Sequence, residues 1–262
     1  SNAGTNSAIT IPTVVATEHG DYVQAWRVAG ISFESADDAA LNGWHERMNA
    51  LLRNLASRKV ALWTHVIRRR DWSYPEAPCA PGFADDLNAR YRQRLAGETL
   101  MVNELYVSLV YRPQPTVAGA AALRWFGTAD VKAARAAQLE ALDACGKLAA
   151  QLAAGMAEAE AEPLGLYEFE RRSYSRLLEF LGLLMNGEWC RWPLVRLPVN
   201  EVLATSRLLF GTEALELRTP TATRLAACLG IKEYPTPTAP GLFNRLLTAP
   251  FPFVLTQSFT FL

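Results

Sequence analysis

Three strand-like segments alternate with two amphipathic helices in the first half of the chain, and this order constrains the fold more than any other feature. Segments 22–33, 59–70 and 101–112 combine β-branched and aromatic residues with the apolar alternation of strands. Between them, apolar residues recur at three- and four-residue steps over 41–55 and 83–95. The order strand–helix–strand–helix–strand predicts a small mixed or antiparallel sheet with helices on one face.

The boundaries of these elements carry their own signals. Residues 35–38 (SADD) resemble a capping box at the start of the first helix. Segment 59–70 is apolar on both alternating faces until its arginines, which is typical of a central strand that emerges at the surface. Pro113 and Pro115 end the third strand, because proline lacks the amide hydrogen that a sheet requires.

An alanine-rich segment free of proline dominates the second half. Between residues 128 and 162, apolar side chains form the narrow seam of a coiled-coil-like helix, although Gly146 and Gly155 weaken the case for an unbroken one. A second helix over 174–185 is expected to pack back against it. Strand patterns follow at 206–218 (a hairpin), 224–233 and 251–261.

The sequence therefore predicts an α+β fold with two lobes and a long alanine-rich helical pair between them. Residues 1–18 are interpreted as a tag remnant and lead-in, because Ser1-Asn2-Ala3 resembles the scar of a cleaved tag. The first α+β lobe is predicted to span 19–126, and the helical pair with a second small α+β lobe to span 127–262. No stretch approaches the roughly 20 apolar residues of a membrane span, so no transmembrane segment is expected.

Charge and cysteine spacing argue against several kinds of binding. Lysine and arginine together number 26, as do aspartate and glutamate, so the chain has no overall field that would attract nucleic acid or an anionic membrane. The four cysteines lie too far apart in sequence for a zinc motif or a redox pair, and free thiols are expected. They are Cys79, Cys145, Cys190 and Cys228.

The sequence points to no catalytic, cofactor-binding or metal-binding residue. A phosphate-binding loop needs the pattern G-x-x-x-x-G-K-[ST], but the one Gly-Lys pair, Gly146-Lys147, lacks the upstream glycine and lies inside the predicted helix. His19, His45 and His65 lack the spacing of a metalloprotease motif. We therefore expect no enzyme activity from this chain, and a free-standing enzyme with an active site assembled from distant residues is only a third hypothesis.

Two features are candidates for an interaction surface. Arg68, Arg69 and Arg70 form the most concentrated basic run, and guanidinium groups suit phosphates and lipid headgroups. The alternative is a solvated strand end whose charges discourage pairing between sheet edges. Trp125 and Phe126 fall in or beside a loop, where aromatic side chains can anchor a protein partner. For these two residues the alternative is burial in the core.

Several runs, taken in order, resemble the CagE/TrbE/VirB component of type IV secretion and conjugation systems. They are DYVQAWRVAGISFES, ALWTHVIRRR, FADDLNARYRQRL, VNELYVSLVYRP and EYPTPTAPGLFNRLLTAPFPFVLTQSFTF, and the match spans about residues 20–262. The resemblance implies the N-terminal domain of a large secretion ATPase. In such proteins the ATP and Mg²⁺ site belongs to a RecA-like C-terminal domain, so no cofactor is expected in this chain.

The resemblance also implies an assembly or docking role. This part would hold the motor against inner-membrane and channel components, and against other copies of itself, at the cytoplasmic, inner face of the bacterial inner membrane. The alternative is a nucleic-acid-contacting module of a conjugative ATPase. The neutral net charge does not favour that alternative.

Overall fold

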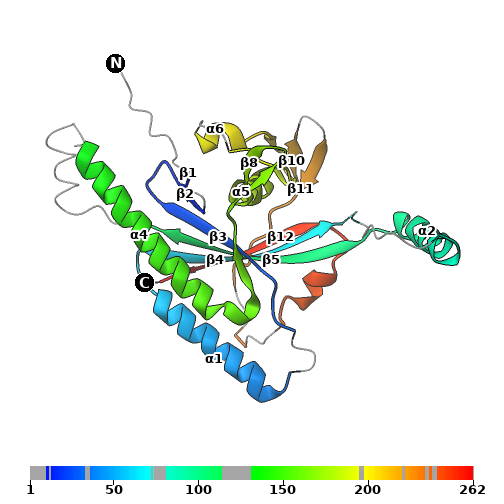
Figure 1. The fold of residues 1–262 in the computed structure, drawn as a ribbon, viewed down its shortest axis with the longest axis horizontal. Coiled ribbons are helices and arrows are strands. Elements are labelled where there is room, and N and C mark those ends of the chain that lie inside the picture. Colours follow the sequence, from blue (N-terminus) through cyan, green and yellow to red (C-terminus); the bar gives the residue numbers. More distant parts are fainter. Residues whose placement is uncertain are drawn as a thin grey trace.

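The structure is a computed structural model, and it describes residues 10–11, 13–32, 36–71, 73, 81–113, 131–194, 198–219, 222–233, 236–237 and 241–261. In these parts the chain has the predicted α+β fold, with several small antiparallel sheets and the helices that pack on them. The layers are visible in Figure 1, where the largest sheet lies between two helical groups.

The largest sheet has seven strands, each antiparallel to its neighbours. Its order is β1-β2-β3-β5-β4-β12, and β6 pairs beside β2 along the outer edge of β3. The strands are β1 (Thr10–Ile11), β2 (Val14–Ala16), β3 (Tyr22–Val28), β4 (Val60–Arg70), β5 (Met101–Tyr111), β6 (Ala161–Pro163) and β12 (Phe253–Thr260). Strands β3, β4 and β5 confirm the three predicted strands, and β4 is paired on both sides, as expected of a central strand.

Both faces of this sheet are covered, because successive side chains of a strand point to opposite faces. The flanking helices are α1 (Asp38–Leu55), α4 (Val131–Gly155) and α5 (Arg176–Asn186). On one face Trp26 and Leu109 pack with residues of α1 and α4. On the other face Ala25 and Tyr106 pack with Phe180 of α5. The arrangement thus differs from the helices on one face that the sequence suggested.

The alanine-rich helix packs against a different helix from the one that the sequence predicted. Helix α4 packs against α1, whereas α5 lies across the sheet from it. The reason is that the seam of α4 is already filled by α1 and the strands, which bury Leu152 completely. Helix α4 continues through Gly146 and ends at Gly155. A Cβ atom at Gly155 would lie 2.6 Å from Leu51 Cδ1, so glycine permits the close approach of α1.

Helix α1 begins within the predicted start at 35–38, and its N-cap is Asp37. The side chain of Asp37 caps it by accepting a hydrogen bond from the amide of Ala40 at 2.8 Å. Helix α2 (Phe83–Ala96) confirms the second predicted helix, and it stands away from the body of the molecule beyond the ends of β4 and β5 (Figure 1). No helix in the described parts of the chain is long and apolar enough to cross a membrane.

The remaining elements are short. Strands β7 (Leu166–Phe169) and β8 (Arg172–Ser175) form a hairpin before α5. A three-stranded sheet of order β11-β10-β9 includes the predicted hairpin. The other elements are α6 (Val199–Leu203), β9 (Arg207–Phe210), β10 (Leu215–Arg218), β11 (Thr223–Ala226) and the 3₁₀ helices η1 (Ala157–Ala159) and η2 (Asn244–Thr248).

Candidate functional site

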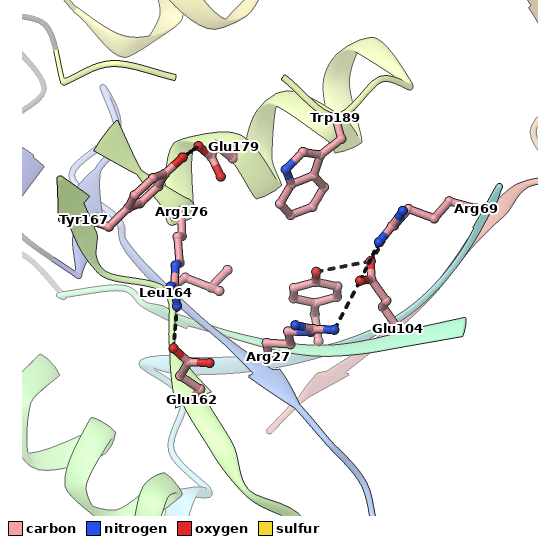
Figure 2. A pocket seen from close by; sticks show the side chains of 10 residues that line it. Arg27, Arg69, Glu104, Glu162, Leu164, Tyr167, Arg176, Glu179 and Trp189 are labelled. Atoms are coloured by element: carbon pink, nitrogen blue, oxygen red, sulfur yellow. Dashed lines mark hydrogen bonds and ion pairs between the residues drawn. The ribbon is translucent and has the colours of Figure 1, made fainter. Parts of the chain in front are cut away.

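A cavity of about 480 Å³ opens between the main sheet and α5 (Figure 2). Strands β3, β4, β5 and β6 of the main sheet contribute residues from one side, and β7 and α5 contribute residues from the other. The lining is charged and aromatic. It consists of Arg27, Arg69, Glu104, Tyr106, Glu162, Leu164, Tyr167, Arg176, Glu179 and Trp189.

The carboxylate of Glu104 organises one end of the cavity. It accepts two hydrogen bonds from Arg69, from Nε and Nη2, both at 3.0 Å. Arg27 Nη2 donates to the same carboxylate at 3.3 Å, and the hydroxyl of Tyr106 donates at 3.4 Å. The two parallel bonds from Arg69 form the bidentate fork that suits a carboxylate best. These hydrogen bonds raise the pKa of Arg69, and the side chain of Glu104 is only 9% exposed.

The opposite end is built on Glu179, a buried residue of α5. Its carboxylate accepts a hydrogen bond from the hydroxyl of Tyr167 at 2.6 Å. Burial, followed by this hydrogen bond, raises the pKa of Tyr167 to about 12. The guanidinium of Arg176 lies 5.6 Å from the centre of the Tyr167 ring and is also paired with Glu162. Tyr167 therefore stays protonated near neutral pH and acts as a hydrogen-bond donor.

The charges of the lining are satisfied by one another. All three arginines pair with a lining glutamate, and Glu179 bonds to a lining tyrosine. Trp189 keeps 39% of its surface exposed, with its ring centre 6.4 Å from that of Tyr106. Within the described residues, no group of three His, Cys, Asp or Glu side chains is placed to hold a metal ion. Such a lining offers aromatic and guanidinium surface for binding a partner.

The three predicted arginines do not form one patch, because neighbouring strand residues point to opposite faces. Arg68 is buried, and its guanidinium donates to the carbonyl oxygens of Leu247 and Ala249, both at 2.6 Å. Arg69 lines the cavity. Only Arg70 of the three is exposed, and a partner contact there stays a prediction.

The other two predicted residues cannot be placed in the structure, and the cavity was not predicted from the sequence. Trp125 and Phe126 fall outside the described residues, so their role also stays a prediction. Sequence reasoning missed the cavity because its walls come from segments far apart in the chain. One signal was present: Glu104 is the only charged residue in the otherwise uncharged run from Met101 to Tyr111.

The one Gly-Lys pair of the sequence does not form a phosphate-binding loop. Gly146 and Lys147 lie within α4, where the backbone amides serve the helix and cannot cradle a phosphate. Lys147 Nζ pairs with Asp143 at 2.7 Å on the same helix.

Comparison with known proteins identifies two matched segments. Residues 13–118 match the family described as "Type IV secretion system ATPase VirB4/TrbE, N-terminal domain". Residues 162–262 match "CagE, TrbE, VirB family, component of type IV transporter system".

Individual relatives extend the similarity over nearly the whole chain. The type IV secretion system protein virB4 of Brucella melitensis is 34% identical over 261 residues, which cover 96% of this chain and 31% of that protein. The virB4 protein of Bartonella quintana is 37% identical, covering 89% of this chain and 30% of its own length. PtlC of Bordetella pertussis is 36% identical, covering 95% and 30%. The chain thus spans about a third of the length of these relatives. It belongs to the CagE/TrbE/VirB family of type IV secretion proteins and corresponds to the N-terminal part of a VirB4-type ATPase.

Proposed function

We propose that this chain is the assembly and docking part of a type IV secretion ATPase. It links the ATP-hydrolysing remainder of the full-length protein to inner-membrane and channel components, at the inner face of the bacterial inner membrane. In this proposal ATP and Mg²⁺ act in that remainder, and Gly146-Lys147, the one Gly-Lys pair of the chain, lies inside α4 and not in a phosphate-binding loop.

The cavity between the main sheet and α5 is the observation that carries this proposal. Five of its six charged side chains form ion pairs with one another, and the sixth, Glu179, accepts a hydrogen bond from Tyr167, so the lining is held in place before a partner arrives. A surface that is ordered in advance loses little side-chain entropy on binding. Trp189 adds an exposed aromatic ring, the type of residue that anchors protein interfaces. These features suit docking of a protein segment.

The test uses the full-length protein with the substitution Trp189→Ala. We expect it to lose most of its co-purification with channel components, while ATP hydrolysis is unchanged. Trp189 is not one of the fully buried core residues, so we expect the variant to fold, and circular dichroism verifies this. Leu229→Ser is the matched control, since this 97% exposed apolar residue lies outside the cavity lining.

A second variant addresses the paired charges. Glu104→Gln breaks the pairing with Arg27 and Arg69 inside the cavity. Glu158→Gln breaks an ion pair with Arg47 that is more exposed and lies outside the cavity. Equal co-purification of both variants would contradict the docking role of the cavity. Hydrolysis of ATP by the 262-residue chain alone, at a rate that survives extensive purification, would contradict the non-catalytic role.

Contact with nucleic acid has less support. Of the three arginines that suggested it, Arg68 is buried and Arg69 is paired with Glu104. DNA binding that weakens steeply with salt and disappears on Arg70→Ala would favour this alternative.

A further inference from the structure

Helix α2 presents an apolar face that the rest of the described chain does not cover. None of its side chains is buried. Phe83 is 83% exposed and Leu87 is 55% exposed, and the four-residue step between them places both on one side of the helix. Leu95, two turns beyond Leu87, is only partly exposed, so the exposed apolar surface is concentrated at Phe83 and Leu87. Figure 1 shows α2 standing apart from the sheet and from the other helices.

The charges of α2 are separated along its length. Asp85 and Asp86 lie in the first turn, whereas Arg90 and Arg94 lie in the second half. This distribution favours the helix dipole, which by itself would explain it. However, Asp86, Arg90 and Arg94 also follow one another at four-residue steps along one flank of the apolar face. A flank that changes sign halfway is complementary to itself when two such helices run in opposite directions.

We propose that α2 pairs with α2 of a second copy of this chain as an antiparallel two-helix contact. In this arrangement the apolar faces meet, and the acidic half of each helix lies beside the basic half of the other. A parallel arrangement would place like charges together, which is unfavourable. The two-fold symmetry makes the contact self-complementary, as in most homodimers. The inference deepens the proposed assembly role by naming a second copy as one partner.

The size of the helix limits the strength of this contact. Fourteen residues form a helix about 21 Å long, at 1.5 Å per residue. Two such helices bury less surface than the roughly 1,000 Å² expected of a stable interface. The dimer of the isolated chain is therefore weak and reversible, and it gains strength only where other contacts hold the copies close together.

A lipid surface fits the same helix less well. Asp85 and Asp86 lie within one turn of Phe83, next to the apolar residues that would enter the membrane. Anionic headgroups would repel these carboxylates. Binding to vesicles is therefore an outcome that the test must distinguish.

Sedimentation equilibrium of the 262-residue chain over a range of concentrations tests the pairing. We expect a monomer–dimer equilibrium that Phe83→Ser combined with Leu87→Ser weakens more than about tenfold. The control Leu229→Ser should leave it unchanged, because this residue is as exposed but lies outside α2. Circular dichroism verifies that each variant is folded.

Charge reversal tests the direction of the helices. Asp85→Arg with Asp86→Arg makes the flanks of α2 basic, and Arg90→Asp with Arg94→Asp makes them acidic. Each pair of substitutions alone should weaken self-association more than about tenfold. A mixture of the two variants should form a heterodimer, and all four substitutions together should restore the homodimer.

Several results would overturn the pairing. These are a chain that stays monomeric at the highest soluble concentration, charge reversals without effect, or equal weakening by the control. Sedimentation with vesicles of anionic lipid that needs Phe83 and Leu87, in a monomeric chain, would assign α2 to a membrane surface instead. A monomeric chain that still captures channel components would refute this pairing and leave the docking role intact.

Discussion

Replacement of Arg68 should destabilise the chain far more than replacement of the neighbouring Arg70. Arg68 connects β4 to the end of η2, because its guanidinium donates to the carbonyl oxygens of Leu247 and Ala249 at 2.6 Å. It also donates to Asn103 Oδ1 on β5 at 2.9 Å. Carbonyl groups at a helix end lack intrahelical donors, and a basic side chain commonly satisfies them.

The expected magnitude follows from these three contacts. A hydrogen bond from a charged donor contributes about 1.5–3 kcal/mol. Two terms reduce the sum for Arg68→Ala. The carbonyl of Leu247 keeps a second donor, Asn103 Nδ2 at 3.0 Å, and removal of a buried cation recovers its desolvation cost. We therefore expect a loss of about 2–4 kcal/mol in the free energy of unfolding. For a chain of this size that lowers the Tm by roughly 5–15 °C.

Urea unfolding followed by tryptophan fluorescence measures this difference. The exposed Arg70→Ala should change the free energy of unfolding by less than about 0.5 kcal/mol. Arg68→Lys should lie between the two, because an ammonium group keeps the charge but cannot reach three acceptors as a planar fork does. If Arg68→Ala and Arg70→Ala unfold at the same urea concentration, the role assigned to Arg68 is wrong. If Arg68→Lys equals the wild type, the charge matters and the fork does not.

Three further changes have defined outcomes. Gly155→Val should lower the free energy of unfolding, measured by thermal unfolding, by about 1–3 kcal/mol, because the new side chain would clash with Leu51 across the α1–α4 contact. Gly146→Ala should not lower it, because the space around Gly146 is open. Burial lowers the pKa of His65 to about 4. Below pH 6.5 the imidazole of His65 is therefore protonated in the unfolded chain but stays neutral in the folded chain until the pH approaches 4. Stability should thus fall by roughly 2–3 kcal/mol as the pH drops from 6.5 to 4, and this part of the loss should be absent in His65→Gln. The thiol of Cys145 is fully buried and its pKa is raised to about 11, so iodoacetamide at pH 8 should leave it unmodified until the chain unfolds, as peptide mapping by mass spectrometry would show.

Local patterns in the sequence predict the main elements well. Strand β4 and helix α2 lie within a residue of their expected bounds, because alternation and helical spacing depend only on neighbours in sequence. The cap at Asp37 is equally local. The need for glycine at position 155, where α4 ends, could not be predicted from neighbouring residues alone, because it depends on the close approach of Leu51 from another helix.

Contacts between elements that lie far apart in the sequence were not predictable. The seam of α4 looks the same whether it packs on α1 or on α5, and only the completed sheet separates those two helices. The arginine run shows the same limit. A sequence of three arginines suggests a patch, but β12 and η2 bury Arg68, and a single glutamate engages Arg69. The cavity could not be predicted either, because its lining comes from six elements that only the complete fold brings together.

The strand order bears on the proposed docking role. The two segments matched by family comparison, 13–118 and 162–262, meet in one sheet, because β12 pairs with β4 and β6 pairs with β3. The cavity takes Glu104 from the first segment and Trp189 from the second. A partner that binds there contacts both segments, and it stabilises the state in which they are joined, because a ligand favours the form that binds it. Docking in the cavity would thereby stabilise the sheet in which β12 pairs with β4 and β6 pairs with β3.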